Sequence, residues 1–113
     1  MPETLTEEQR ATRVFLAGHT GLVGSAILRS LQERGYQNLL LRTHAELDLT
    51  HQAQTRAFFA EEQPQMVILA AARVGGIMAN WEYPYDFIQE NLAIELNVIH
   101  EAFRAGVKRL IFL

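Results

Sequence analysis

The sequence predicts an α/β fold, a doubly wound parallel β-sheet with helices on both faces. Three short apolar runs, 14–17, 39–41 and 66–72, have the composition of buried strands. The segments between them repeat apolar residues every three or four positions, which is typical of amphipathic helices. Buried strands that alternate with such helices form βαβ units, because parallel strands need a crossover connection.

The first residues, 1–12, form a polar N-terminal extension before a single domain over 13–113. Within the extension, Thr6 and Gln9 have the spacing of a capping box. A short helix and a loosely ordered tail are therefore both open alternatives for this segment.

A helix is expected after the first strand, and Gly35 is placed to end it with a left-handed residue. The residues expected on its inner face are Val23, Ala26, Ile27, Ser30 and Leu31. Next comes the second strand, Leu39 to Leu41, followed by a short extended piece over 46–50.

Thr50 is a candidate N-cap for a helix over 51–62, and Pro64 would stop it. The expected inner edge of this helix is Ala53, Ala57, Phe58 and Glu61. After the third strand, Val74 to Gly76 form a loop and Pro84 interrupts the chain.

A long helix is expected from about Tyr85 to Ala105, ended by Gly106. Its expected inner residues are Ile88, Leu92, Val98, Ile99, Ala102 and Phe103. Lys108 to Leu113 then predict another buried strand, which stops without a turn. We therefore expect a sheet that is truncated after about four or five strands.

Composition and charge exclude several classes of protein. The chain has no cysteine, and its four histidines lack metal-ligand spacing, so neither a disulfide framework nor a metal site is expected. The net charge is −3 without a basic stripe, which argues against nucleic-acid binding. No apolar run is long enough for a membrane span, and the acidic N-terminus is no signal peptide. A cytoplasmic protein that binds a small molecule is expected.

Glycines recur with the spacing G-x-x-G-x-x-G between the first strand and the first helix. In this context Gly18 allows a tight turn, Gly21 lets the backbone approach a pyrophosphate, and Gly24 lets helix and strand pack closely. The free N–H groups of the helix N-terminus would bind the phosphates. The motif favours a Rossmann-like dinucleotide-binding fold over the alternative of a plain glycine turn.

The end of the second strand discriminates between nicotinamide cofactors. An acidic side chain there binds the ribose 2′-hydroxyl of NAD, whereas a basic one accommodates the 2′-phosphate of NADP. Arg42 occupies this position and favours NADP, although a solvated charge at a strand end is an alternative. Asp48 and Leu49 either flank the adenine or simply form the turn before a helix.

Two further features lie where open α/β sheets bind ligands. The small residues Ala70, Ala71 and Ala72 end the third strand and either leave room for a ligand or allow close helix packing. Asn91 falls on the inward half of the long helix, where it either contacts the cofactor or is a satisfied core residue.

Two segments also resemble a known family. The first is residues 13–27, RVFLAGHTGLVGSAI, and the more specific one is residues 69–80, LAAARVGGIMAN, continuing through Tyr83-Pro84 to Glu90-Asn91-Leu92. Both are similar to the GDP-L-fucose synthases, extended short-chain dehydrogenase/reductases of the NAD-dependent epimerase/dehydratase family. The resemblance extends over 13–113.

The resemblance implies a role for each matching segment. The pyrophosphate of NADP would be held by Gly18, His19, Thr20, Gly21, Leu22, Val23 and Gly24. The adenosine 2′-phosphate end would be lined by Arg42, Thr43, His44, Ala45, Glu46 and Leu47, with Asp48 and Leu49 at the adenine. The ribose and nicotinamide would lie beside Ala70, Ala71 and Ala72, with Asn91 near the cofactor. Relatives often have basic residues in place of Thr20 and His44, so NAD stays possible.

The resemblance also implies an activity, the conversion of GDP-4-keto-6-deoxymannose to GDP-L-fucose by epimerisation and NADPH-dependent reduction. The family's chemistry needs a Ser and a Tyr-x-x-x-Lys pair, in which Lys lowers the pKa of the Tyr acid-base. No Tyr-x-x-x-Lys occurs here, so no catalytic residue is assigned and the 113 residues alone are expected to be inactive. The alternatives are a related NAD-dependent nucleotide-sugar epimerase or dehydratase and a non-catalytic nucleotide-binding fragment. A homodimer is possible for the complete enzyme.

Overall fold

A computed structural model describes residues 4–70 and 84–113. Four parallel strands form one sheet in the order β2-β1-β3-β4. Their bounds are β1 Val14–Ala17, β2 Leu39–Leu40, β3 Met66–Leu69 and β4 Arg109–Phe112. The parallel sheet confirms the predicted fold class, with β1 between its neighbours β2 and β3.

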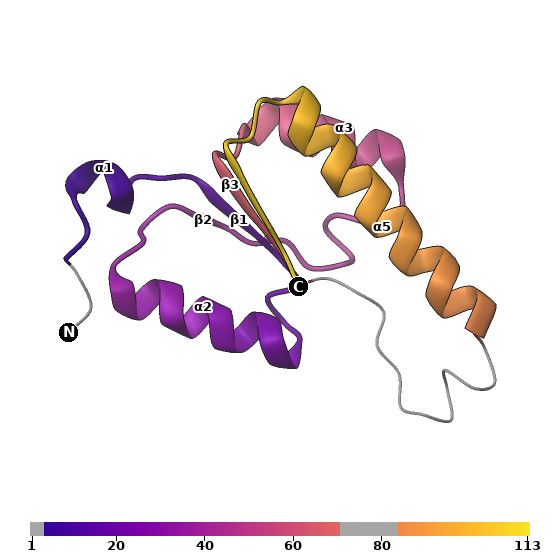
Figure 1. The fold of residues 1–113 in the computed structure, drawn as a ribbon, viewed down its shortest axis with the longest axis horizontal. Coiled ribbons are helices and arrows are strands. Elements are labelled where there is room, and N and C mark those ends of the chain that lie inside the picture. The colour runs from indigo at the N-terminus through magenta and orange to yellow at the C-terminus, as the bar shows by residue number, and fades with distance from the viewer. Residues whose placement is uncertain (1–3, 71–83) are drawn as a thin grey trace.

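Helices cover both faces of this sheet, as predicted (Figure 1). α2 Leu22–Arg34 lies on one side, and α3 Gln52–Glu62 and α5 Pro84–Arg104 lie on the other. Each of these three helices comes between two strands in the chain, as crossover connections of a parallel sheet require. Gly35, with φ +100°, ends α2 in the left-handed conformation that was expected of it.

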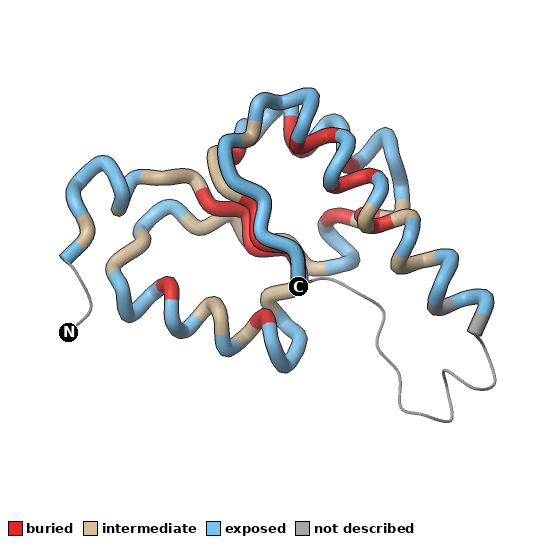
Figure 2. Tube along the Cα trace, viewed as in Figure 1, coloured by how far each residue is buried: buried red, intermediate tan, exposed pale blue. Residues whose placement is uncertain are grey.

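The core consists of two clusters, one on each face of the sheet. Alternate residues of β1 divide between them, since successive side chains of a strand point to opposite faces. Val14 and Leu16 pack with Leu31 of α2, whereas Phe15 and Ala17 pack toward α3 and α5. Figure 2 shows the buried residues concentrated in the central strands and in the helix faces that look toward them.

The N-terminal extension contains a short helix, α1 Glu7–Arg10. Thr6 Oγ1 accepts a hydrogen bond from the Gln9 backbone N–H at 3.1 Å. Gln9 Oε1 accepts one from the Thr6 N–H at 2.8 Å. The capping box therefore forms, and the described part of the extension adopts the helical alternative.

The expected inner face of α2 is only partly correct. Leu31 is buried and Ile27 is half-buried against the core, but Val23, Ala26 and Ser30 are exposed. The physical reason is Gly24, which is buried against the backbone of Gly18. This contact determines the rotation of the helix and turns the three exposed positions outward.

The start and the inner edge of α3 differ from expectation. The N-cap is His51, whose Nδ1 accepts from the Gln54 N–H at 3.3 Å, while the Thr50 hydroxyl donates to Asp48 instead. The helix buries Thr55, Phe58 and Phe59, and leaves Ala53, Ala57 and Glu61 exposed. The phenylalanine rings pack on Phe15, so aromatic contacts orient this helix. The preceding residues 46–50 form turns rather than an extended piece.

The long helix α5 was expected with the wrong face inward at four positions. Ile88, Leu92, Ile99 and Phe103 are exposed, Phe103 to 84%, whereas Val98 and Ala102 are buried as predicted. The buried face also includes Ile94 and two polar residues, Asn97 and Glu101. Because α5 has apolar residues around much of its circumference, the polar pair decides its rotation. Asn97 bonds to Leu49 O, and Glu101 pairs with Arg56 Nε at 3.5 Å.

The final strand is present, but it is not buried as predicted. Leu110, Ile111 and Phe112 of β4 are exposed to 36%, 43% and 46%. β4 is the outermost strand and pairs only with β3 in the described sheet. A strand with one neighbour leaves one edge and part of both faces open to solvent.

Candidate functional site

A cavity of about 500 Å³ opens at the carboxyl ends of β1 and β3. It lies between the glycine loop after β1, the segment after β2 and the face of α5. Its described lining consists of Phe15, Ala17, Gly18, Thr20, Gly21, Arg42, His44, Leu47, Leu49, Thr50, Ala70, Glu90 and Ile94. This is the edge at which open α/β sheets bind their ligands.

The glycine loop forms the first wall of the cavity, through Gly18, Thr20 and Gly21. Gly18 has φ +91°, a conformation that side chains disfavour, and its carbonyl accepts from the Gly21 N–H at 3.1 Å. Gly21 is the N-cap of α2, and no side chain caps that helix end. The first N–H groups of α2 are therefore available to an anion at the cavity, where the helix dipole also favours negative charge.

Gly24 explains why the loop lies so close to the helix. A Cβ built on Gly24 would stand 1.7 Å from Gly18 O, so only glycine fits. The backbone there is compact enough to leave His19 Nδ1 buried without a hydrogen-bond partner among the described residues. The third glycine of the motif thus has the packing role expected of it.

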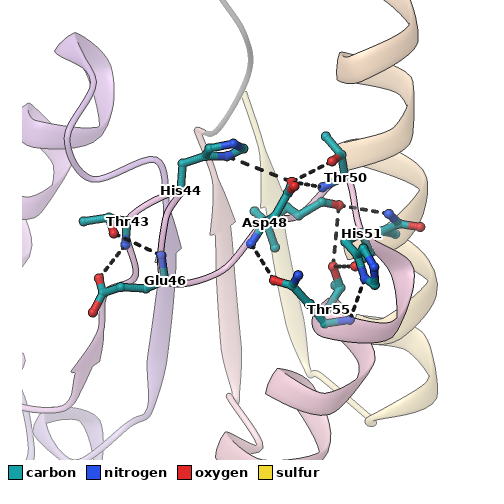
Figure 3. Close-up of polar contacts among 10 residues, drawn as sticks. Thr43, His44, Glu46, Asp48, Thr50, His51 and Thr55 are labelled. Carbon is teal, nitrogen blue, oxygen red and sulfur yellow. Dashed lines mark hydrogen bonds and ion pairs between the residues drawn. The ribbon is translucent and has the colours of Figure 1, made fainter.

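The segment 43–50 forms the second wall, and side-chain hydrogen bonds shape it (Figure 3). Glu46 Oε1 accepts from the Thr43 N–H at 2.8 Å, and Thr43 Oγ1 accepts from the Glu46 N–H at 3.3 Å. Hydrogen bonding from the backbone N–H and, next, from the side chain of Thr43 lowers the pKa of the Glu46 carboxyl below its ordinary value. The turn is closed by this reciprocal pair, and Glu46 stays ionised.

A second turn is formed around Asp48. Its Oδ1 accepts from the Thr50 hydroxyl at 2.6 Å and from the Thr50 N–H at 3.0 Å. The hydroxyl bond above all lowers the pKa of the Asp48 carboxyl. His44 Nδ1 lies 4.0 Å from the same oxygen, and its ring points toward Asp48 in Figure 3. The Asp48 carboxylate therefore contacts residues on both sides of it in the chain, His44 before it and Thr50 after it.

Asn97 of α5 connects this wall to the core through a hydrogen bond. Its buried Nδ2 donates to Leu49 O at 2.9 Å, and the Thr55 hydroxyl donates to His51 O at 3.0 Å. Leu47 and Leu49 are buried on either side of Asp48, which is half-buried. The alternation places two leucines under the cavity and turns the carboxylate away from it.

Arg42 lies just after β2, and three contacts hold its guanidinium. Nη1 donates to Leu41 O at 2.9 Å, and Nη2 contacts Glu62 Oε1 at 3.2 Å. The guanidinium carbon lies 5.3 Å from the centre of the Phe58 ring, a cation–π distance. Arg42 is the only described lining residue with a permanent positive charge.

The cavity brings together some of the residues expected at the site and leaves others outside it. Those in its lining are Gly18, Thr20, Gly21, Arg42, His44, Leu47, Leu49 and Ala70. Those outside the lining are His19, Leu22, Val23, Gly24, Thr43, Ala45, Glu46, Asp48 and Asn91. Ala71 and Ala72 lie outside the described residues, and so does the loop at Val74 to Gly76.

Sequence reasoning missed several residues of the site. Phe15, Thr50, Glu90 and Ile94 line the cavity, and Asn97 supports it from behind. Asn97 stands next to Val98 and one turn before Glu101 on the helix, and polar residues with this spacing are typical of a solvent-exposed face. One sequence signal could have identified Asn97 and Glu101 as buried. Val98 and Ala102, each of which follows one member of the pair, were expected to be buried.

Nowhere in 4–70 and 84–113 do three or more His, Asp or Glu side chains gather as metal ligands would. No helix in those same ranges has the length and apolar character needed to cross a membrane.

Comparisons with known proteins agree with this geometry. The chain is 58% identical to GDP-L-fucose synthase 1 of Arabidopsis thaliana, and the match includes all of this chain and 36% of that protein. It is 54% identical to the GDP-L-fucose synthase of Escherichia coli K12, over 89% of this chain and 32% of that one. The chain thus spans about a third of the length of these curated relatives.

A solved structure with a bound dinucleotide has the same fold. The GDP-mannoheptose C4 reductase of Campylobacter jejuni with NADP bound superposes with a TM-score of 0.88 at 45% identity, over 92% of this chain and 31% of that one. In addition, the model of the NAD dependent epimerase/dehydratase family matches residues 14–113. From its parallel sheet, its glycine loop and this match, we conclude that the chain belongs to the NAD dependent epimerase/dehydratase family.

Proposed function

We propose that this chain is the NADP(H)-binding part of a nucleotide-sugar epimerase-reductase that converts GDP-4-keto-6-deoxymannose to GDP-L-fucose. The main observation is the cavity at the strand ends. On one side of it lies the N-terminus of α2, which no side chain caps, and on the other side lies Arg42. The identity to GDP-L-fucose synthases supports the choice of substrate. We assign the extension to 1–12 and the nucleotide-binding domain to 13–113.

The shape and chemistry of the cavity fit a dinucleotide phosphate. The pyrophosphate would lie on the N–H groups beyond Gly21, where no side chain intervenes. The 2′-phosphate would contact Arg42, and the adenine would rest against Leu47 and Leu49. Ala70, at the end of β3, would face the ribose on the nicotinamide side. The expected residues outside the lining, such as Asp48 and Gly24, would act by shaping these walls.

When bound, NADPH supplies a hydride for reduction of the sugar ketone. The 113 residues contain no Tyr-x-x-x-Lys pair, so we assign them no acid-base residue. Their part is to bind the cofactor, to orient it and to exclude water from one of its faces. We expect a polypeptide of only these residues to bind nucleotide without turnover.

The alternative is a related epimerase or dehydratase that uses NAD. One observation favours it: the charge of Arg42, the only permanent cation of the described lining, is paired with Glu62. A non-catalytic nucleotide-binding fragment would also account for the cavity. The C. jejuni reductase, which has NADP bound in its solved structure, supports NADP over NAD for this fold.

Equilibrium binding of the two cofactors tests the proposal. Calorimetric titration of the protein should show NADP binding tighter than NAD binding. Arg42→Gln should weaken NADP by about tenfold, since a charge-assisted contact to phosphate is lost, and leave NAD nearly unchanged. Arg29→Gln, on the exposed side of α2, is the matched control and should change neither. Equal binding of both cofactors by the wild-type protein would contradict the assignment of NADP.

We also propose a cytoplasmic location and a homodimer for the assembled enzyme. The outer face of α5 supports the dimer, because an isologous interface needs one apolar surface that can pack on its own copy. Its exposed apolar residues are Ile88, Leu92, Leu96, Ile99 and Phe103. Sedimentation velocity of Leu96→Glu should report a monomer where the wild-type protein is a dimer.

A further inference from the structure

Glu62 contacts the one side chain to which we assign cofactor preference. It lies at the last position of α3, and its Oε1 is 3.2 Å from Arg42 Nη2. Both side chains are 31% exposed, so the pair is partly shielded from water. Glu62 does not line the cavity itself. Nothing in the glycine motif or in the strand-end rule draws attention to this residue.

The other contacts of Arg42 position its guanidinium without help from Glu62. The bond from Nη1 to Leu41 O fixes one end of the group, and the Phe58 ring lies at a cation–π distance from its carbon. Leu41 O is part of the backbone and Phe58 is 7% exposed in the core, so both supports are rigid. What Glu62 adds is therefore mainly a negative charge beside the guanidinium.

We propose that Glu62 is a specificity-determining residue, which weakens the preference for NADP over NAD by neutralising Arg42. The inference rests on the proposed function, since it assumes that Arg42 receives the 2′-phosphate. A phosphate and the Glu62 carboxylate compete for the same guanidinium, whose charge can be neutralised by either of them. A ribose 2′-hydroxyl has no charge, so the binding of NAD is not subject to this competition.

The composition of the described lining makes the competition effective. Apart from Arg42, its only basic side chain is His44, which is 81% exposed and lies beside the Asp48 carboxylate. Thr20 is neutral and exposed. Loss of the Arg42 charge is therefore not compensated by a second fixed cation among the described lining residues.

The substitution Glu62→Gln separates charge from position. Glutamine keeps an oxygen that accepts from Arg42 Nη2 and removes the negative charge. We expect the Kd of NADP to fall about two- to fivefold, the range for a partly exposed ion pair. The Kd of NAD should stay within about twofold, because no charged group of NAD meets Arg42.

Glu61→Gln is the matched control, since it removes the same charge from the neighbouring exposed position of α3. It should leave the NADP-to-NAD ratio of Kd values unchanged, which excludes a general effect of net charge. In an Arg42→Gln background, Glu62→Gln should have no effect on the ratio. Circular dichroism of each variant identifies any loss of fold. If Glu62→Gln does not fold, Glu62→Asp is the second variant, and its carboxylate is one methylene further from Arg42. It should shift the NADP-to-NAD ratio of Kd values in the same direction by less.

The outcomes distinguish this inference from the proposed function. If the wild-type protein binds neither nucleotide, the proposed function is wrong. If it binds NADP but Glu62→Gln weakens that binding, or changes both cofactors equally, then Glu62 only positions Arg42 or stabilises α3. A preferential gain for NADP that disappears without Arg42 supports the inference.

Discussion

The two walls of the cavity are built in opposite ways. The glycine loop, 18–24, offers backbone N–H groups and is shaped by missing side chains, above all at Gly24. The segment 43–50 is shaped by side chains that bond to neighbouring backbone, with Glu46 and Asp48 as the acceptors. One wall therefore depends on empty space, and the other depends on a hydrogen-bond network.

This difference determines how each wall responds to substitution. A side chain added at a glycine of the first wall meets backbone or would occupy the proposed place of a phosphate, so the effect is steric. Removal of a polar side chain from the second wall leaves its hydrogen-bond partner to be solvated or unpaired, so the effect is electrostatic. Substitutions in and behind each wall test this contrast.

The largest effect is expected from Gly24→Ala. The new Cβ would stand 1.7 Å from Gly18 O, and neither backbone segment can move without disturbing β1 or α2. We expect the free energy of unfolding to fall by about 3 kcal/mol or more, as in an overpacked core. Urea unfolding followed by circular dichroism measures it. A loss below about 1 kcal/mol would mean that helix and loop are not rigidly packed.

Removal of the amide of Asn97 should have the next largest effect. Among the residues that the structure describes, Asn97→Ala leaves the buried carbonyl of Leu49 with only the long 3.5 Å contact from the Thr55 hydroxyl. We expect a loss of about 1–3 kcal/mol in the free energy of unfolding, measured by urea titration. Asn38→Ala is the control, because its bond to Ala11 O is exposed and 3.4 Å long. Equal losses in the two variants would contradict the anchoring role of Asn97.

Gly21→Ala should separate ligand binding from folding. Its Cβ would be 3.6 Å from Gly18 O, an ordinary contact, and its φ of −77° suits alanine. The fold should lose no more than about 1 kcal/mol, since alanine is a poorer N-cap than glycine. NADP binding should weaken by about tenfold, or about 1.4 kcal/mol, because the methyl group is added to a residue that lines the cavity. Calorimetry that finds unchanged affinity would place the phosphates elsewhere.

The smallest effect concerns Asp48 and appears only in acid. Bonds from Thr50 lower the pKa of this carboxyl in the folded protein below its ordinary value of 3.8. Its stabilising contribution is therefore complete above that pH and is lost as the pH falls through the lower, folded pKa. The difference in unfolding free energy between wild type and Asp48→Asn should shrink across this window. Glu33→Gln, on the exposed end of α2, should show no such dependence.

Residue spacing and the general conformational rules for glycine were sufficient to predict the parallel strands, the turn at Gly18 and the buried Gly24. Helix rotation could not be predicted, because periodicity identifies an apolar face without saying which neighbour it meets. On α5, two faces satisfied the apolar period, and the buried polar pair Asn97 and Glu101 chose between them.

Some residues of the candidate site could likewise be predicted from the sequence, and others could not. Gly18, Gly21 and Arg42 were expected from a motif and line the cavity, since their positions are set by the ends of strands. The asparagine that holds the wall is Asn97, further along the same helix than Asn91, whose expected place near the cofactor stays a prediction. Asn97 bonds to a carbonyl 48 residues earlier, and pairs so distant in the chain leave no local pattern.

The central place of β1 has a consequence for the dynamics of the molecule. Its residues are at most 1% exposed, and the strand has hydrogen-bonded partners on both edges, whereas β4 has one such partner in the described sheet. Amide hydrogens of β1 can exchange with solvent only when the whole sheet opens, while those on the free edge of β4 exchange through local fraying. The floor of the nucleotide cavity is thus expected to exchange more slowly than the outer edge of the same sheet.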